Sequence, residues 1–157
     1  KSAKAIGISS GIIKGDIVID HYGEAKIIEI AARLSGGWLA SHQIPTATGV
    51  NLVEAVMNQS LSIPIDKKDL EPRLDKSTSI RYWFPENGLI TRISGEDQLK
   101  KCAGLMKYGF FRSVGDQQPI IRMHPDRFGY VMVSGKDRDE TKENIIKALE
   151  SINIEVE

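Results

Sequence analysis

The sequence predicts an α+β protein built from two units, and three observations support this. Short β-branched segments recur along the chain, apolar residues at helical spacing appear between them, and a polar, proline-bounded segment interrupts the pattern at 64–79. We therefore expect a first unit at 1–63, a linker at 64–79 and a smaller β-rich α+β unit at 80–157. Antiparallel sheets with packed helices are expected, because short turns join neighbouring strands.

Composition limits the class of protein. The chain has 157 residues, of which 41% are hydrophobic and 27% are charged, so it can bury a core and is not expected to be disordered. Lys plus Arg equals Asp plus Glu at 21 each, and no basic stripe indicates a nucleic acid partner. No apolar run reaches the roughly 18 residues of a membrane span. The single cysteine, Cys102, excludes an internal disulfide and fits a reducing compartment, so we expect a cytoplasmic protein.

The start of the chain indicates a fragment. Neither a signal peptide nor an initiator methionine opens it, and its first residues, KSAKAIGI, are typical of the end of a helix and its exit. We therefore expect the sequence to be a piece of a longer protein, with preceding domains of the same chain outside it.

The first unit is expected to begin with a β-hairpin. A β-branched, alternating segment predicts a strand at about 12–19, and a returning strand follows at 24–33. The paired glycines of LSGGW predict a loop. A helix is expected at about 51–60, because Asn51 and the glutamate three residues later have capping spacing.

The second unit is expected to alternate strands and helices. We predict a hairpin from IRYWF and LITRI around the turn PENG, and a helix that opens near Ser94 and carries apolar residues as far as Met106. Further strands are predicted in YGFFRSV, FGYVMVSG and NIEVE, and a capped helix in KDRDETKENIIKALESI. The expected core residues of this unit are Trp83, Phe84, Cys102, Ile145, Ile146, Leu149 and Ile152.

One face of the first hairpin carries an unusual set of charges. Side chains alternate along a strand, so nearly all the isoleucines are expected on one face, packed on the core. Asp16, Glu29 and Arg33 are expected on the other face, together with Ile27. Antiparallel pairing brings the two carboxylates together, where they repel unless a cation lies between them. Mg²⁺ prefers such oxygen ligands, and Arg33 could hold an anionic oxygen beside it. The alternative is a solvated face with an ordinary ion pair.

Four other residues are candidates for binding a nucleotide or its substrate. Lys14 shares the face of Asp16 and could contact a phosphate, although it could also be simply solvated. Gly36 and Gly37 could present backbone N–H groups to an anion, although a plain loop explains them equally well. His42 could line an acceptor pocket, or it could make a structural hydrogen bond.

The segment GIIKGDIVID…GEAKIIEIAARLSGGWLASHQIPTATGVNLVEAVM resembles the C-terminal half of the ATP-grasp fold. Members of that family hold Mg²⁺ through two acids on a hairpin, and the sequence Glu29-Ile-Ala-Ala-Arg33 is similar to their second metal motif. The likeness covers about residues 3 to 61 closely. Residues 80 to 157 resemble, more loosely, the small C-terminal domain of the biotin carboxylase, carbamoyl-phosphate synthase and L-amino-acid ligase branch.

The resemblance implies a fragment of an ATP-dependent ligase. Asp16 and Glu29 would hold Mg²⁺ (or Mn²⁺) on the phosphates of ATP, and Arg33 would steady the reacting carboxylate or acyl phosphate. The substrate would be a small carboxylate or bicarbonate, which an amine-type nucleophile then captures. Large relatives often associate, so a homodimer is left open.

Two departures from the family pattern keep other functions open. Ala31 stands where many members have an asparagine that helps to hold a second metal ion, and Asp16 is shorter than the more usual glutamate. The subdomain that clamps ATP lies outside this sequence, so we expect the fragment alone to be inactive. A pseudo-enzyme that binds nucleotide without turnover and a non-catalytic binding module are the two alternatives.

Overall fold

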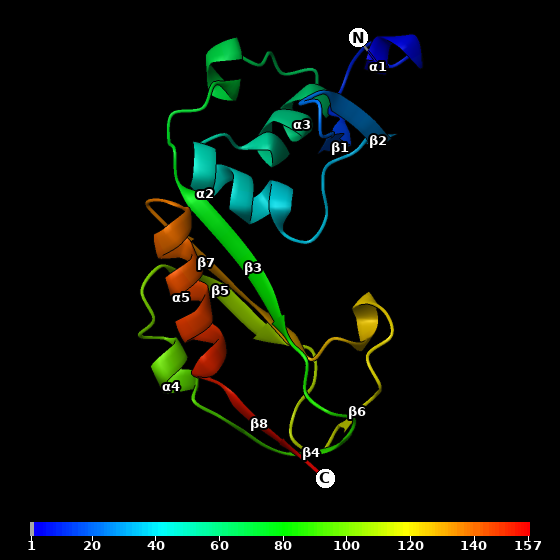
Figure 1. The fold of residues 1–157 in the computed structure, drawn as a ribbon. Coiled ribbons are helices and arrows are strands. Elements are labelled where there is room, and N and C mark those ends of the chain that lie inside the picture. The colour runs from blue at the N-terminus through cyan, green and yellow to red at the C-terminus, as the bar shows by residue number, and fades with distance from the viewer. Residues whose placement is uncertain (1) are drawn as a thin grey trace. The chain divides into compact units, whose positions relative to one another are not determined.

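Antiparallel strands and short helices make up both halves of the chain, which confirms the predicted α+β class. In the computed structural model, which describes residues 2–157, the chain divides into one unit at Lys1–Leu74 and another at Asp75–Glu157 (Figure 1). No helix within residues 2–157 has the length and apolar character of a membrane span.

The first unit contains the predicted hairpin and several short helical segments. Its elements are α1 (Ser2–Ala5), β1 (Lys14–Ile19), β2 (Ala25–Ala31), a π-helix (Leu39–Gln43), α2 (Ile44–Thr48), α3 (Leu52–Ser60) and a 3₁₀ turn (Lys67–Leu70). The Asp20 carboxylate closes the turn between β1 and β2 by accepting the backbone N–H groups of Tyr22 and Glu24, both at 2.9 Å. The hairpin predicted from the alternating pattern is therefore confirmed.

Helix α3 begins where its capping pair predicts. The Asn51 side chain accepts the Glu54 backbone N–H at 3.2 Å and donates back to the Glu54 carboxylate at 3.0 Å. The π-helix and α2, which precede it, were not predicted. Each has only five residues, and one turn of helix is too short to show an apolar period.

The polar segment after α3 folds back on the first unit as far as Leu74. The backbone N–H groups of Arg73 and Leu74 both donate to the Thr48 carbonyl, at 2.7 and 3.1 Å. The Arg73 guanidinium also donates to the Gly49 carbonyl at 2.7 Å. These bonds fasten the segment to the end of α2, so the expected linker at 64–79 is shared between the two units.

Replacing Arg73 with alanine is expected to loosen this attachment. The variant loses a charge-assisted hydrogen bond at a partly solvated site, so the free energy of unfolding of the first unit should fall by about 1 kcal/mol. Amide hydrogen exchange of residues 66–74 measures the effect directly, with Lys76→Ala as the control because Lys76 lies outside the first unit. Unchanged exchange in the Arg73 variant would contradict the role of this bond.

The apolar residues of the hairpin are exposed, so the expectation that they pack on a core was wrong. Ile17, Ile19 and Ile28 are 56%, 63% and 69% exposed, because β1 and β2 form a two-stranded sheet by themselves. A bulge also changes the predicted faces: Asp16 pairs with Glu29 but Ile17 pairs with Ile27. Ile27 therefore lies on the isoleucine face and not beside Glu29, as simple alternation had predicted.

The second unit contains two small sheets and one long helix. β3 (Ser77–Trp83), β7 (Gly129–Gly135) and β5 (Leu105–Phe110) form the first sheet, in that order. β6 (Gln117–Gln118), β4 (Gly88–Ser94) and β8 (Asn153–Val156) form the second. The remaining elements are α4 (Glu96–Leu99), a 3₁₀ turn (His124–Asp126) and α5 (Arg138–Glu150).

Helix α5 covers the first sheet and closes the main core. Asp137 caps it as predicted by accepting the Glu140 N–H at 2.9 Å, and the Trp83 indole donates to the Leu149 carbonyl at 3.1 Å. The buried cluster includes Trp83, Ile90, Leu99, Phe128, Val131, Val133, Ile145, Ala148 and Ile152, with Cys102 and Leu149 packed against it.

Two residues predicted in the core lie on the surface. Ile146 is 43% exposed, because α5 turns Asn144, Ile145 and Ala148 toward the sheet and Ile146 falls on the flank of that face. Phe84 is 63% exposed, because it follows the last residue of β3.

The predicted hairpin in the second unit was also wrong. β3 pairs with β7, whereas β4 pairs with β6 and β8, so the turn PENG leads from one sheet to the other. The helix predicted to reach Met106 ends at Leu99, and Met106 lies in β5. Gly104, at φ +68°, lies so close to the Ser134 carbonyl that a Cβ would clash with it, and here the chain turns into β5.

Candidate active site

The two carboxylates predicted to face each other do so. Asp16 and Glu29 are direct partners in the register of β1 and β2. The Lys14 ammonium contacts the Asp16 carboxylate and lies 3.7 Å from Glu29 Oε1. Half of each acidic side chain is exposed, whereas Lys14 is 21% exposed. The hairpin thus holds two carboxylates and one shared cation on a single face.

The charges of this group suit a divalent cation. One ammonium cannot neutralise two carboxylates, so a net negative charge remains at the face. Within residues 2–157 no cluster of three or more His, Cys, Asp or Glu side chains could hold a metal ion. Two carboxylates are nevertheless sufficient for Mg²⁺, which usually keeps several waters and takes its other ligands from substrate phosphates.

Arg33 forms no ion pair with the two carboxylates of this face. Strand β2 ends at Ala31, so the alternation that predicted a shared face with Glu29 stops two residues before Arg33. Its guanidinium donates to the Leu34 carbonyl at 3.1 Å, and it makes no ion pair with a carboxylate of residues 2–157. The exposed guanidinium therefore keeps most of its donors for a ligand.

The glycine loop has an unusual backbone. Gly37 and Trp38 both have left-handed conformations, at φ +60° and +64°, and a Cβ on Gly36 or Gly37 would meet nothing within 4 Å. The loop is thus open on the side of these glycines. His42, on the π-helix that follows, packs edge-on against Trp38 with 5.3 Å between ring centroids, and its Nδ1 lies 2.8 Å from the Ser41 hydroxyl.

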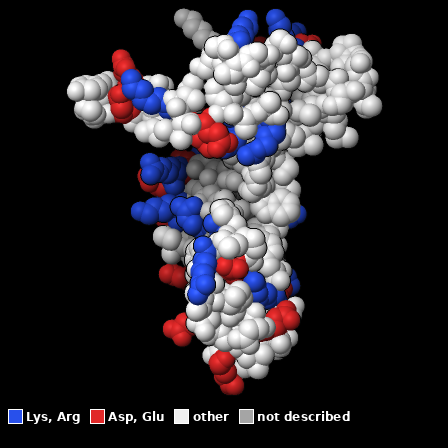
Figure 2. Space-filling model, turned by 90° about the vertical axis from the view of Figure 1, so that its right-hand side faces the viewer, with Lys and Arg blue, Asp and Glu red and all other residues white. Residues whose placement is uncertain are grey.

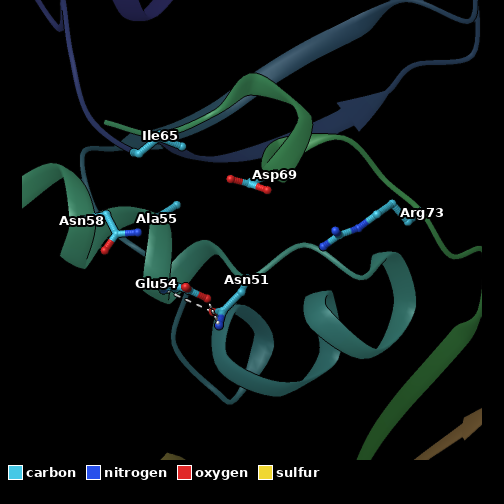
Figure 3. Close-up of a pocket in the computed structure, with 7 residues that line it drawn as sticks. All are labelled: Asn51, Glu54, Ala55, Asn58, Ile65, Asp69 and Arg73. Atoms are coloured by element: carbon cyan, nitrogen blue, oxygen red, sulfur yellow. Dashed lines mark hydrogen bonds between the residues drawn. The ribbon is translucent and has the colours of Figure 1, made fainter. Parts of the chain in front are cut away.

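A polar pocket in the first unit was missed by sequence reasoning. It has a volume of about 140 Å³ and lies between α3 and the returning segment (Figure 3). Its lining residues are Asn51, Glu54, Ala55, Asn58, Ile65, Asp69 and Arg73. Glu54 is engaged in the cap of α3 and Arg73 in holding Gly49, so these side chains have structural partners. The sequence offers no local signal, because the pocket exists only once the segment folds back.

Comparison with known proteins supports the same family as the sequence pattern. A family model described as L-amino acid ligase C-terminal domain 2 matches residues 81–157. Phosphoribosylglycinamide synthetase from Anaerococcus prevotii matches with a TM-score of 0.83 and 18% identity, over 99% of this chain and 39% of that one. L-amino acid ligase from Bacillus licheniformis matches with a TM-score of 0.83 and 18% identity, over 99% of this chain and 40% of that one. Biotin carboxylase from Campylobacter jejuni matches with a TM-score of 0.65 and 17% identity, over 99% of this chain and 34% of that one.

These matches define the fold of the chain. The chain has the fold of the C-terminal part of ATP-grasp ligases, and the resemblance predicted from the sequence is confirmed. More particularly, residues 81–157 are similar to the family described as L-amino acid ligase C-terminal domain 2. A comparison with curated protein sequences finds no significant match. The chain spans only 39% and 40% of the lengths of the first two related structures.

Proposed function

We propose that the protein containing this chain is an ATP-dependent ligase that activates a carboxylate as an acyl phosphate for attack by an amine-type nucleophile. The observation that carries this proposal is the register of the hairpin, in which Asp16 lies directly opposite Glu29. The L-amino acid ligase family model that matches residues 81–157 supports an amino acid as the carboxylate substrate, and bicarbonate is the second candidate. The single cysteine supports a cytoplasmic location.

Each residue of the site has a role in this proposal. Asp16 and Glu29 would hold Mg²⁺ or Mn²⁺, which would neutralise charge on the ATP phosphates. Arg33 exchanges its bond to the Leu34 carbonyl for the anionic oxygens of the reacting carboxylate. The open loop at Gly36 and Gly37 donates backbone N–H groups to an anion. His42, on the helix that follows, lines the acceptor pocket.

The reaction proceeds in two steps. In the first, a carboxylate oxygen of the substrate bonds to the γ-phosphorus of ATP, the bond from that phosphorus to the bridging oxygen breaks, and ADP leaves. In the second, the amine nitrogen bonds to the acyl carbon, inorganic phosphate leaves and the nitrogen loses a proton. Positioning and charge stabilisation supply most of the catalysis in such a phosphoryl transfer.

The exposed hairpin supports the proposal that further domains of the same chain complete the site. Six large aliphatic side chains of the hairpin region are exposed, namely Ile13, Ile17, Val18, Ile19, Ile27 and Ile28. Exposed apolar side chains at this density in a short hairpin indicate an interaction site more often than a free surface. We propose that domains equivalent to the part of the related structures that this chain does not span cover these side chains in the full-length protein.

Replacing Lys14 with methionine is expected to have opposite effects on the metal and on the nucleotide. The ammonium competes with a divalent cation for both carboxylates, so its removal should strengthen Mn²⁺ binding by this chain about threefold, as expected for a half-exposed ion pair. If Lys14 also contacts a phosphate, the KM for ATP of the full-length protein should rise. Mn²⁺ relaxation measurements and steady-state kinetics test the two effects, and weaker Mn²⁺ binding would contradict the shared-cation arrangement.

The proposed function is tested on the full-length protein. We expect ADP release that requires both Mg²⁺ and a carboxylate when L-amino acids, singly and in pairs, and bicarbonate are supplied in turn. Nucleotide binding without ADP release from any of them would favour the pseudo-enzyme. No nucleotide binding at all would favour the non-catalytic module, and either result would overturn the ligase proposal.

A further inference from the structure

A second concave surface lies wholly within the C-terminal unit. It is a groove of about 460 Å³ between the first half of β3 and the first two turns of α5. Strand β3 contributes three lining residues that carry hydroxyls, Ser77, Thr78 and Ser79. Three cationic residues line the same groove, Arg81, Arg138 and Lys142. Neither the proposed ligase reaction nor the hairpin site uses any of these residues.

The groove is polar because the core ends partway along β3. Trp83 points to the buried core beneath α5, and alternation sets Arg81, Ser79 and Ser77 on the same face, progressively farther from that core. Ser77 pairs with Gly135, and α5 begins three residues after that glycine. The start of the helix therefore lies beside the start of the strand, where the interface is lined by hydroxyls and cations.

The cations of the groove lack anionic partners. Within residues 2–157, Arg138 and Lys142 make no ion pair, and the Arg81 guanidinium donates only to the Ile80 carbonyl, at 2.8 Å. One carboxylate, Asp139, also lines the groove, and it too makes no ion pair. Three cations against one carboxylate leave a net positive charge in a confined space, which an anion would relieve.

Strand β3 adds further donors at its free edge. Among the described strands β3 pairs with β7 alone, so it is an edge of its sheet. In an antiparallel ladder every second residue directs its backbone N–H away from the partner strand. The groove thus combines guanidinium groups, an ammonium and hydroxyls with the free edge of β3. Figure 2 shows Lys and Arg side chains on the surface of the molecule, with Asp and Glu side chains interspersed among them.

We propose that this groove binds a small phosphate-bearing ligand. Arginine forks match the oxygens of a phosphate, hydroxyls and N–H groups donate to the remaining lone pairs, and lysine adds charge without directional demands. The volume is within the range of small-molecule pockets and exceeds what one phosphate ion fills. The ligand is therefore a phosphorylated small molecule. None of the lining residues belongs to the hairpin, so this proposal stands whether or not the ligase proposal is correct.

The test is a titration of the 157-residue chain with inorganic phosphate and pyrophosphate, without divalent cations and at constant ionic strength, followed by amide NMR. We expect saturable shifts confined to residues 77–81 and 138–142. Arg138→Ala and Lys142→Ala should each weaken binding about tenfold, as the loss of a charge-assisted contact implies. Lys147→Ala is the matched control, because Lys147 is an exposed lysine of the same helix outside the groove. The affinity of this variant for phosphate should stay within twofold of that of the unchanged chain.

Three results would overturn the proposal. Shifts that are not saturable, or that spread over all basic residues, would show simple charge screening. An equal loss of affinity in Lys147→Ala would show that only the net charge of the helix matters. Succinate that binds in the groove more tightly than phosphate would show a carboxylate site. The unchanged amide spectrum away from the groove serves as the check that the variants remain folded.

Discussion

In the full-length protein, Glu29→Gln is expected to lower the proposed ligase turnover at least about 100-fold, because a ligand of the proposed metal ion would contribute several kcal/mol to the stabilisation of the reacting phosphates. Glutamine keeps the size of the side chain and removes its charge. The remaining carboxylate, Asp16, is still in contact with Lys14, so the face would carry no net negative charge to hold a divalent cation. ADP release at saturating Mg²⁺ measures the loss.

Glu24→Gln is the matched control for this experiment. Glu24 lies on the same hairpin, is exposed and pairs with Lys26, but it is not opposite Asp16. Its replacement should leave turnover within about twofold, as is usual for an exposed ion pair. Unfolding curves of both variants should match that of the unchanged protein. If Glu29→Gln and Glu24→Gln had equal turnover, the hairpin face would be an ordinary solvated surface and the metal site would be refuted.

The second large effect is expected on stability, from Gly95→Ala. Gly95 has φ +99° at the start of α4, and a Cβ there would lie 1.8 Å from the Ser151 carbonyl oxygen, at the end of α5. A backbone atom cannot move aside as a flexible side chain can. We therefore expect a loss of about 4 kcal/mol in the free energy of unfolding of the second unit, enough to unfold a marginally stable domain.

Gly115→Ala separates the two causes of that loss. Gly115 has a similar φ of +94°, but a Cβ there would meet nothing within 4 Å. This variant should lose only the roughly 1 kcal/mol that alanine pays in a left-handed conformation. Urea unfolding followed by amide signals of residues 75–157 gives both values. Equal losses would mean that backbone conformation, and not close packing against Ser151, accounts for the effect of Gly95.

Local patterns predicted the elements whose signals lie within a few residues. The hairpin, the caps of α3 and α5 and the strand β7 all follow from alternation or from capping pairs. The pairing of Asp16 with Glu29 was predictable for the same reason, because a short turn specifies which residues of a hairpin face each other. The role of that pair as a metal site remains a proposal.

Other features could not be read locally because they depend on partners distant in the sequence. The strands β3 and β4 look like a hairpin, yet β3 pairs with β7 and β4 pairs with β6 and β8, all of which lie about 30 or more residues later. The bulge that moved Ile27 to the other face and the early end of β2 before Arg33 are likewise properties of the paired strands. β-strand propensity describes single segments, whereas the pairing of strands depends on which apolar surfaces the folded chain must bury.

The sequence by itself determined the fold class of this protein, its likeness to the ATP-grasp ligases and the acidic pair at its hairpin. Each of these depends on residues that lie close together in the sequence. Only the tertiary structure decided that Lys14 lies against both carboxylates and that the isoleucines of the hairpin stay exposed. It also brought the cations of α5 beside the hydroxyls of β3. The physical reason is the same in each case: burial and charge neutralisation are satisfied between segments, and their balance is settled only when the chain has folded.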